Sequence, residues 1–123
     1  MRVLVIDDDV DVREMICKML AGEDYDVLAA ANGKEGMEII KSEPEINIVI
    51  TDLIMPEKEG IETIQEIKRD FPHIRILAIS GGGRGSAQDY LALAKGMGAN
   101  LTLNKPFVKH ELLKAVNEIL EGK

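Results

Sequence analysis

The sequence predicts a single α/β domain built on a parallel sheet. Short runs of β-branched and aliphatic residues alternate with segments of helical periodicity along the chain, which is the pattern of repeating βα units. No internal repeat, low-complexity stretch or linker interrupts this alternation. The 123 residues are enough for one hydrophobic core but too few for two. We therefore expect one domain over residues 1–123.

The first half of the chain contains three expected strands and two expected helices. The strands cover residues 2–7, 25–30 and 46–51. Apolar residues at helical spacing predict a helix after the first strand, which Gly22 can end. Asn32 followed by Glu35 resembles a capping box at the start of the second helix, and Pro44 ends that helix.

The second half continues the same alternation. Two further strands are expected at residues 74–80 and 101–103. The helix between the third and fourth strands stops near Pro72. A glycine-rich stretch, residues 81–85, follows the fourth strand, and Ser86 with Asp89 resembles a second capping box. The last helix presents an apolar face that begins at Val108.

The composition is that of a soluble globular protein, with 46% hydrophobic and 30% charged residues. Fifteen basic and 22 acidic residues give a net charge of −7, which argues against a nucleic-acid partner. No apolar run approaches the roughly 20 residues that span a bilayer, and no secretion signal is visible. The single cysteine, Cys17, fits a reducing compartment. We expect a cytoplasmic protein without a membrane partner.

Four of the expected strands end in residues suited to phosphate chemistry. These residues are Asp7, Asp8 and Asp9 after the first strand, Asp52 after the third, Ser80 at the end of the fourth and Lys105 after the fifth. Because the carboxyl ends of parallel strands meet at one edge of a sheet, where such folds bind ligands, we expect these side chains to form one site. Their chemistry predicts a magnesium-assisted phosphoryl acceptor.

The acidic residues suit a magnesium ion. Crowded carboxylates destabilise one another unless a cation joins them. Mg²⁺ prefers oxygen ligands and is usually held by one or two carboxylates plus a phosphate. Asp7, Asp8 and Asp52 fit this role if the first and third strands are neighbours. The alternative is that aspartates cap the following helix, and we expect Asp9 to do so.

A carboxylate such as that of Asp52 can act as a nucleophile toward a phosphoryl donor and form an aspartyl phosphate. Lys105 can supply the ammonium that holds the transferred group, and Ser80 can donate its hydroxyl to a phosphate oxygen. The alternatives are a solvated surface lysine at Lys105 and a serine that merely starts a loop at Ser80.

These residues lie in motifs that resemble the receiver domain of bacterial two-component response regulators. The similarity runs, in order, through VLVIDDD, TDLIMPEKEG, ILAIS and GANLTLNKPF. It covers essentially the whole chain. The resemblance implies a doubly wound, flavodoxin-like sheet of five parallel strands in the order 2-1-3-4-5, with five helices.

The resemblance also implies a role for each site residue. Asp52 is then the phosphoacceptor, Lys105 the phosphate-pairing lysine and Ser80 the hydroxyl of the conformational switch. Asp7, Asp8 and Asp52, with the backbone carbonyl of Ile54, are the implied magnesium ligands. The bond between Lys105 and Pro106 is expected to be cis, which costs an X-Pro bond only about 0.5–1 kcal/mol.

Two positions depart from the family pattern. The family usually carries Tyr or Phe three residues before the lysine, and its inward rotation reports phosphorylation; this chain has Thr102 there. An acid is common after Gly-Ala, where this chain has Asn100 and Leu101. The resemblance implies that Thr102 alters the usual coupling of the hydroxyl and the aromatic ring. It also implies that dimerisation through the fourth helix, fifth strand and fifth helix lacks its usual interface acid. We expect the domain to contact an unknown downstream protein through that same face.

The leading hypothesis is a phosphorylation-dependent signalling domain that uses Mg²⁺. A sensor histidine kinase or a histidine phosphotransfer protein donates the phosphoryl group, and a conformational change then controls protein–protein contacts. We expect no enzymatic activity beyond the domain's own phosphorylation and dephosphorylation. Both a single-domain regulator and a receiver segment of a longer protein fit the sequence.

Two alternatives belong to other functional classes. A docking adapter could use the same fold without phosphorylation, although the complete set of site residues argues against this. A small flavodoxin-like cofactor enzyme is disfavoured because two Tyr, two Phe and no Trp leave few aromatic rings to stack a flavin.

Overall fold

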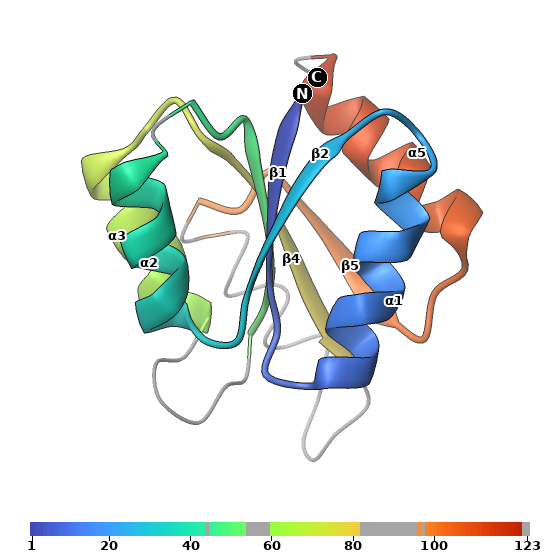
Figure 1. Cartoon of the computed structure of the whole chain (residues 1–123). Coiled ribbons are helices and arrows are strands. Elements are labelled where there is room, and N and C mark those ends of the chain that lie inside the picture. Colours follow the sequence, from blue (N-terminus) through green and yellow to red (C-terminus); the bar gives the residue numbers. More distant parts are fainter. Residues whose placement is uncertain (44, 54–59, 82–95, 97, 122–123) are drawn as a thin grey trace.

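The computed structural model contains a five-stranded parallel sheet with helices on both faces (Figure 1). It describes residues 1–43, 45–53, 60–81, 96 and 98–121. The strands are β1 (Arg2–Ile6), β2 (Asp26–Ala30), β3 (Ile48–Asp52), β4 (Arg75–Gly81) and β5 (Leu101–Lys105). Their order is β2-β1-β3-β4-β5 and all neighbouring pairs are parallel, so the expected doubly wound sheet is confirmed.

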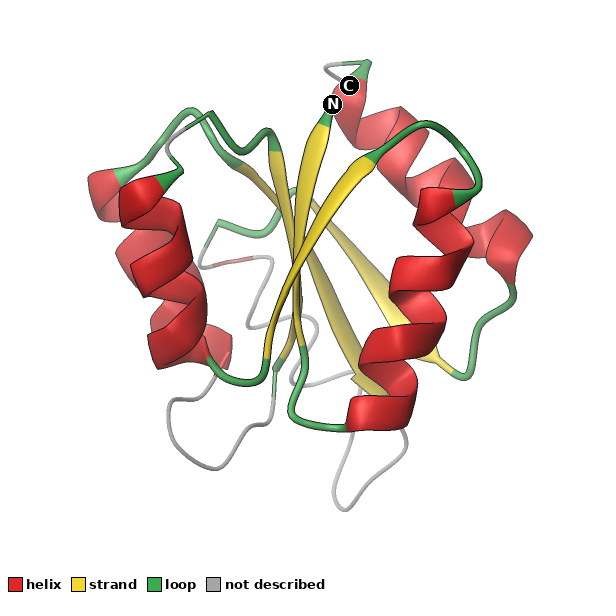
Figure 2. Cartoon of the chain, in the orientation of Figure 1, coloured by secondary structure: helices red, strands yellow, loops and turns green. Residues whose placement is uncertain are grey.

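Four helices are present within the described ranges. They are α1 (Val10–Ala21), α2 (Gly33–Ser42), α3 (Gly60–Asp70) and α5 (Lys109–Leu120). Helices α2 and α3 cover one face of the sheet, and α1 and α5 cover the other (Figure 2). The expected helix after Ser86 and the glycines at 82, 83 and 85 lie outside the described residues. No helix in the described part of the chain is long and apolar enough to cross a bilayer.

The strands carry apolar side chains on both faces because helices cover both. Leu4, Val49 and Ile76 belong to the core beneath α2 and α3. Val5 and Ile50 belong to the core beneath α1 and α5. All five residues are at most 1% exposed. The alternation of side chains along each strand therefore builds two cores and leaves the strand ends to carry the polar chemistry.

Side-chain caps fix the starts of two helices. An oxygen of Asp9 accepts hydrogen bonds from the Asp11 and Val12 N–H groups at 2.9 and 3.3 Å, so the expected cap of α1 is confirmed. The Asn32 amide oxygen accepts from the Glu35 N–H at 2.8 Å. The Glu35 carboxylate accepts from the N–H of residue 31, whereas a capping box would pair it with Asn32 itself.

Two asparagines extend the sheet by one residue beyond its strands. Asn47 pairs with Arg2 through both its side-chain oxygen, at 2.8 Å, and its N–H, at 2.9 Å. Asn100 pairs with Ile76 in the same way, at 2.9 and 2.8 Å. The prediction that the third strand begins at residue 46 was wrong by two residues. The reason is that an amide side chain replaces part of the ladder at Asn47.

Candidate functional site

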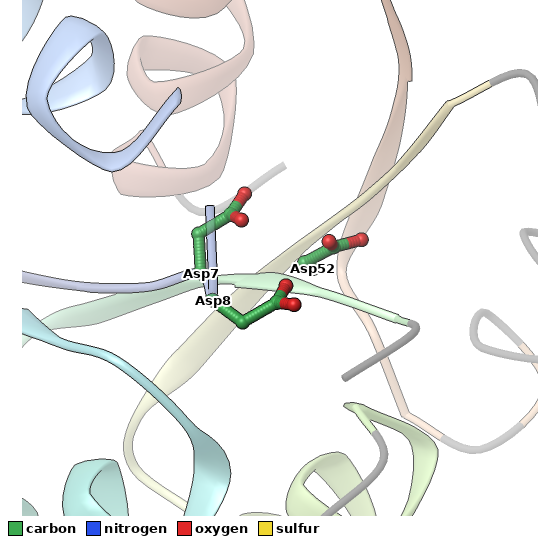
Figure 3. Close-up of side chains that lie close together, drawn as sticks. All are labelled: Asp7, Asp8 and Asp52. Carbon is green, nitrogen blue, oxygen red and sulfur yellow. The ribbon is translucent and has the colours of Figure 1, made fainter. Parts of the chain in front are cut away.

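Three carboxylates converge at the carboxyl end of β1 and β3 (Figure 3). Asp7 and Asp8 follow β1 directly, and Asp52 is the last residue of β3. The two strands are neighbours, with Ile6 opposite Thr51, which satisfies the condition for a shared site. One carboxylate oxygen from each aspartate lies within 4.8 Å of the others.

Asp7 is the buried member of this group, with 1% of the residue exposed. Its N–H donates to the Ala30 carbonyl at 3.2 Å, and its Oδ1 accepts from the Asp9 N–H at 2.9 Å. Asp52 is half-buried and Asp8 is exposed. The cluster is therefore anchored at Asp7 and opens to solvent through Asp8.

Lys105 contacts the carboxylates from β5, the strand that lies beyond β4. Its Nζ lies 3.3 Å from an oxygen of Asp7 and 3.3 Å from an oxygen of Asp52. Burial opposes the charged form of Lys105, but Asp52 and Asp7 outweigh this effect and raise its pKa above the ordinary value. The surface-lysine interpretation is wrong, because the side chain is only 23% exposed and bridges two acids.

β5 continues to Lys105, two residues beyond the expected end of this strand. The backbone of Lys105 is therefore part of the sheet, where it pairs with Gly81. The following Lys105–Pro106 peptide bond is cis, as the resemblance implies. This geometry delivers the ammonium group to the same edge as the aspartates.

Gly60 brings the start of α3 directly against the end of β3. A Cβ atom added at Gly60 would lie 2.2 Å from the Asp52 carbonyl oxygen and 2.5 Å from the Leu53 Cα. The Gly60 N–H donates to the Leu53 carbonyl at 2.9 Å, and the Leu53 N–H donates to the Ile79 carbonyl at 3.0 Å. The backbone that carries Asp52 is thus held from both sides, and only glycine fits the approach.

Ser80 and Thr102 lie on the two strands beyond β3. Ser80 is 1% exposed and lies inside β4, so the interpretation of a serine that merely starts a loop is wrong. It pairs in register with Asn104, one residue before Lys105. Thr102 is half-buried and lines a surface cavity of about 320 Å³ together with His110 and Lys114 of α5. Ile54, the fourth expected metal ligand, lies outside the described residues.

The structure thus brings together Asp7, Asp8, Asp52 and Lys105, and places Ser80 on the intervening strand. Sequence reasoning did not single out Gly60, although it ends one of the quoted motifs. It also missed Arg13, whose guanidinium Nη1 donates to the Asp7 carbonyl at 2.8 Å. The position of Arg13 in the sequence, one helical turn after Asp9, was the available signal. That signal predicts the hydrogen bond to the Asp7 carbonyl only when the geometry of the turn between β1 and α1 is known.

The donor set fits a magnesium ion. Three carboxylates supply only oxygen donors, and one of them is exposed, which leaves room for water and phosphate ligands. Lys105 occupies the side of the cluster between Asp7 and Asp52. In a doubly wound sheet, the carboxyl edge that carries these groups is where ligands bind.

Comparison with known proteins identifies the family. The family model of the response regulator receiver domain matches residues 3–117, and the chain belongs to this family. The Chemotaxis protein CheY of Thermotoga maritima is 34% identical over 119 residues, which are 96% of each chain. A response regulator receiver domain protein from Clostridium thermocellum has a crystal structure that matches with a TM-score of 0.87 and 33% identity, covering 95% of this chain and 91% of that one.

Other relatives are longer proteins. The CpxR homolog of Haemophilus influenzae, named as a transcriptional regulatory protein, is 32% identical over 119 residues. The match covers 97% of this chain and 50% of that protein. The chain spans about half the length or less of the first curated relatives that it matches. A receiver domain is a signalling domain of a two-component system, so the flavodoxin-like cofactor enzyme that the sequence left open is not supported.

Proposed function

We propose that this receiver domain accepts a phosphoryl group on Asp52 from the phosphohistidine of a sensor kinase or a histidine phosphotransfer protein. The observation that carries the proposal is the position of the Lys105 ammonium, 3.3 Å from both Asp7 and Asp52. A fixed cation beside a strand-end carboxylate is what phosphoryl transfer to that carboxylate requires.

Asp52 is a better acceptor than its neighbours. Both oxygens of Asp7 are engaged, one by the Asp9 N–H and one by Lys105, and its side chain is 2% exposed. Asp8 is exposed to water and lies outside the strand ladder. Asp52 combines partial exposure with a backbone held by β4 and by Gly60. Its carboxylate can therefore meet a donor in a defined orientation.

In the proposed reaction a carboxylate oxygen of Asp52 forms a bond to phosphorus, and the bond between phosphorus and the donor's histidine nitrogen breaks. The electron pair of the broken bond stays on the imidazole, which takes up a proton. Lys105 stays charged, because its pKa is raised, and pairs with the oxygens of the transferred group. Ser80, on the neighbouring strand, donates its hydroxyl to one of them.

Asp7, Asp8 and Asp52, with the carbonyl of residue 54, would hold the magnesium ion. Bound there, Mg²⁺ supplies positive charge that offsets the charge of the phosphoryl oxygens. Phosphorylation then shifts the conformation of the domain and changes its contacts with a downstream protein. We place those contacts on the face formed by β5 and α5, where Thr102 replaces the usual aromatic residue.

The test is incubation with acetyl phosphate and Mg²⁺, followed by intact mass measurement. We expect wild type to gain one phosphoryl group, and Asp52→Ala to gain none. Asp9→Ala is the matched control, because Asp9 lies at the same corner but caps α1; its loss costs about 1 kcal/mol and leaves the acceptor in place. If wild type gains no phosphoryl group from either acetyl phosphate or a phosphohistidine donor, the proposal is contradicted. The phosphorylation-independent docking adapter is then the remaining hypothesis.

A further inference from the structure

Arg13 reaches from α1 to the corner of the acidic site. Its Nη1 donates a hydrogen bond to the backbone carbonyl of Asp7 at 2.8 Å, and the side chain is half-buried. The Arg13 N–H donates to the Asp9 carbonyl at 2.9 Å, so the residue has a fixed place in the first turns of the helix. A charged donor makes this bond stronger than one between neutral groups.

The Asp7 carbonyl belongs to the same planar peptide group as the Asp8 N–H. A bond that holds this carbonyl therefore holds the plane from which Asp8 projects. Asp7 is secured by further contacts, since its N–H bonds to Ala30 and its two carboxylate oxygens lie within reach of the Asp9 N–H and Lys105. Asp8 follows the strand, is exposed, and lies in a bend.

We propose that Arg13 is a positioning residue for the magnesium site. It holds the peptide between Asp7 and Asp8 so that the Asp8 carboxylate faces those of Asp7 and Asp52. This inference rests on the proposed function, because it assumes that the acidic cluster binds Mg²⁺. Groups that orient metal ligands without touching the metal commonly change affinity by about 10–100-fold when they are removed.

The charge of Arg13 acts in the opposite direction. A cation near three carboxylates repels an incoming Mg²⁺, so removing the charge alone would tighten binding. Weaker binding in a variant that lacks the guanidinium would therefore report lost positioning. Arg13→Met suits this purpose, because methionine keeps an unbranched side chain but has no donor and no charge.

The experiment is calorimetric titration of the full chain with MgCl₂, with urea unfolding of each metal-free variant to establish that it is folded. We expect R13M to bind Mg²⁺ about tenfold more weakly than wild type. R13K, which keeps a charge and a single-centre donor, falls between the two. The matched control is Lys18→Met, which removes a cation from the last turn of the same helix and leaves Mg²⁺ affinity unchanged.

Equal or tighter Mg²⁺ binding by R13M would overturn the inference, as would an equal loss in K18M. If R13M does not fold, the Mg²⁺ affinity of R13K is the test. An R13K variant that binds Mg²⁺ as tightly as wild type would overturn the inference. A wild-type chain that binds no Mg²⁺ would instead contradict the proposed function. The two failures are thus distinguishable by the wild-type titration.

Discussion

Lys105 and Asp7 lie 98 positions apart in the chain, yet the Lys105 Nζ is 3.3 Å from an oxygen of the Asp7 carboxylate. The contact joins the end of β5 to the end of β1, across β3 and β4. The same ammonium lies 3.3 Å from Asp52, so one cation spans the buried and the half-buried acids of the cluster. This bridge joins the acids of the cluster, and under the proposed function it would place a positive charge beside the phosphoryl group.

Lys105→Met should therefore destabilise the domain. The buried carboxylate of Asp7 would lose its cation, and we expect the free energy of unfolding near neutral pH to fall by about 1–3 kcal/mol. Urea unfolding measures the change. Lys18→Met is the control, because Lys18 is exposed on α1. Equal stability of K105M and wild type would show that the bridge contributes nothing.

The same bridge predicts a pH dependence. Because the pKa of Lys105 is raised in the folded state, its contribution is complete below the unfolded lysine pKa of about 10.4 and is lost as the pH rises through the higher folded value. The stability difference between wild type and K105M should be constant from about pH 7 to about pH 9 and shrink above about pH 10. Urea unfolding over this range tests it, and a difference that grows with alkaline pH would contradict it.

Gly60→Ala should disrupt the acceptor. The added methyl group would lie 2.2 Å from the Asp52 carbonyl oxygen, so α3 or the end of β3 must move, at a cost of about 1–3 kcal/mol. We expect lower stability together with slower phosphorylation by acetyl phosphate. Gly96→Ala is the matched control, since a Cβ there meets no described atom within 4 Å. Wild-type phosphorylation rates in G60A would show that the close approach does not position Asp52.

Asn100→Ala should weaken the junction of β4 and β5. The variant leaves the N–H of Ile76, a fully buried residue, without the amide oxygen that accepts from it at 2.9 Å. We expect a loss of about 1–3 kcal/mol in the free energy of unfolding. Asn100→Asp keeps an acceptor and should lose less. Identical losses in the two variants, measured by urea unfolding, would indicate that the hydrogen bond is not the cause.

Magnesium should stabilise the folded chain. A ligand that binds only the native state adds about 2.7 kcal/mol at one hundred times its Kd, and thermal unfolding with and without MgCl₂ measures the effect. Asp8→Asn should remove most of this gain while leaving the metal-free protein at least as stable as wild type, because one like charge is gone. Asp11→Asn, an acid in the first turn of α1, should respond to Mg²⁺ as wild type does.

The sequence predicts the alternation of strands and helices because short aliphatic runs and segments of helical periodicity follow one another along the chain. The strand order was predicted from the family resemblance. The sequence predicts strand ends less well. Before β3, the Asn47 side-chain oxygen accepts the hydrogen bond from the Arg2 N–H that a backbone carbonyl would otherwise accept. At the other strand, β5 continues through the polar residues Asn104 and Lys105. Neither effect can be seen in the hydrophobic pattern of the sequence, since the first depends on an amide group and the second on pairing with β4.

The candidate site, too, has residues that the sequence predicts and residues that it does not. Asp7, Asp8, Asp52 and Lys105 were predictable, because parallel strands deliver their carboxyl ends to one edge. Gly60 was not, because its importance lies in how closely α3 approaches β3. The supporting contacts depend on the relative placement of helices and strands, which periodicity does not specify.

The most direct test of the account is to locate the phosphoryl group itself. Wild type would be phosphorylated with acetyl phosphate and Mg²⁺ and then treated with borohydride, which reduces an acyl phosphate and converts the modified aspartate to homoserine. Peptide mass spectrometry then identifies the converted position. We predict homoserine at position 52 alone. Conversion at Asp7, Asp8 or Asp9, or at no aspartate, would contradict the assignment of Asp52 as the phosphoacceptor.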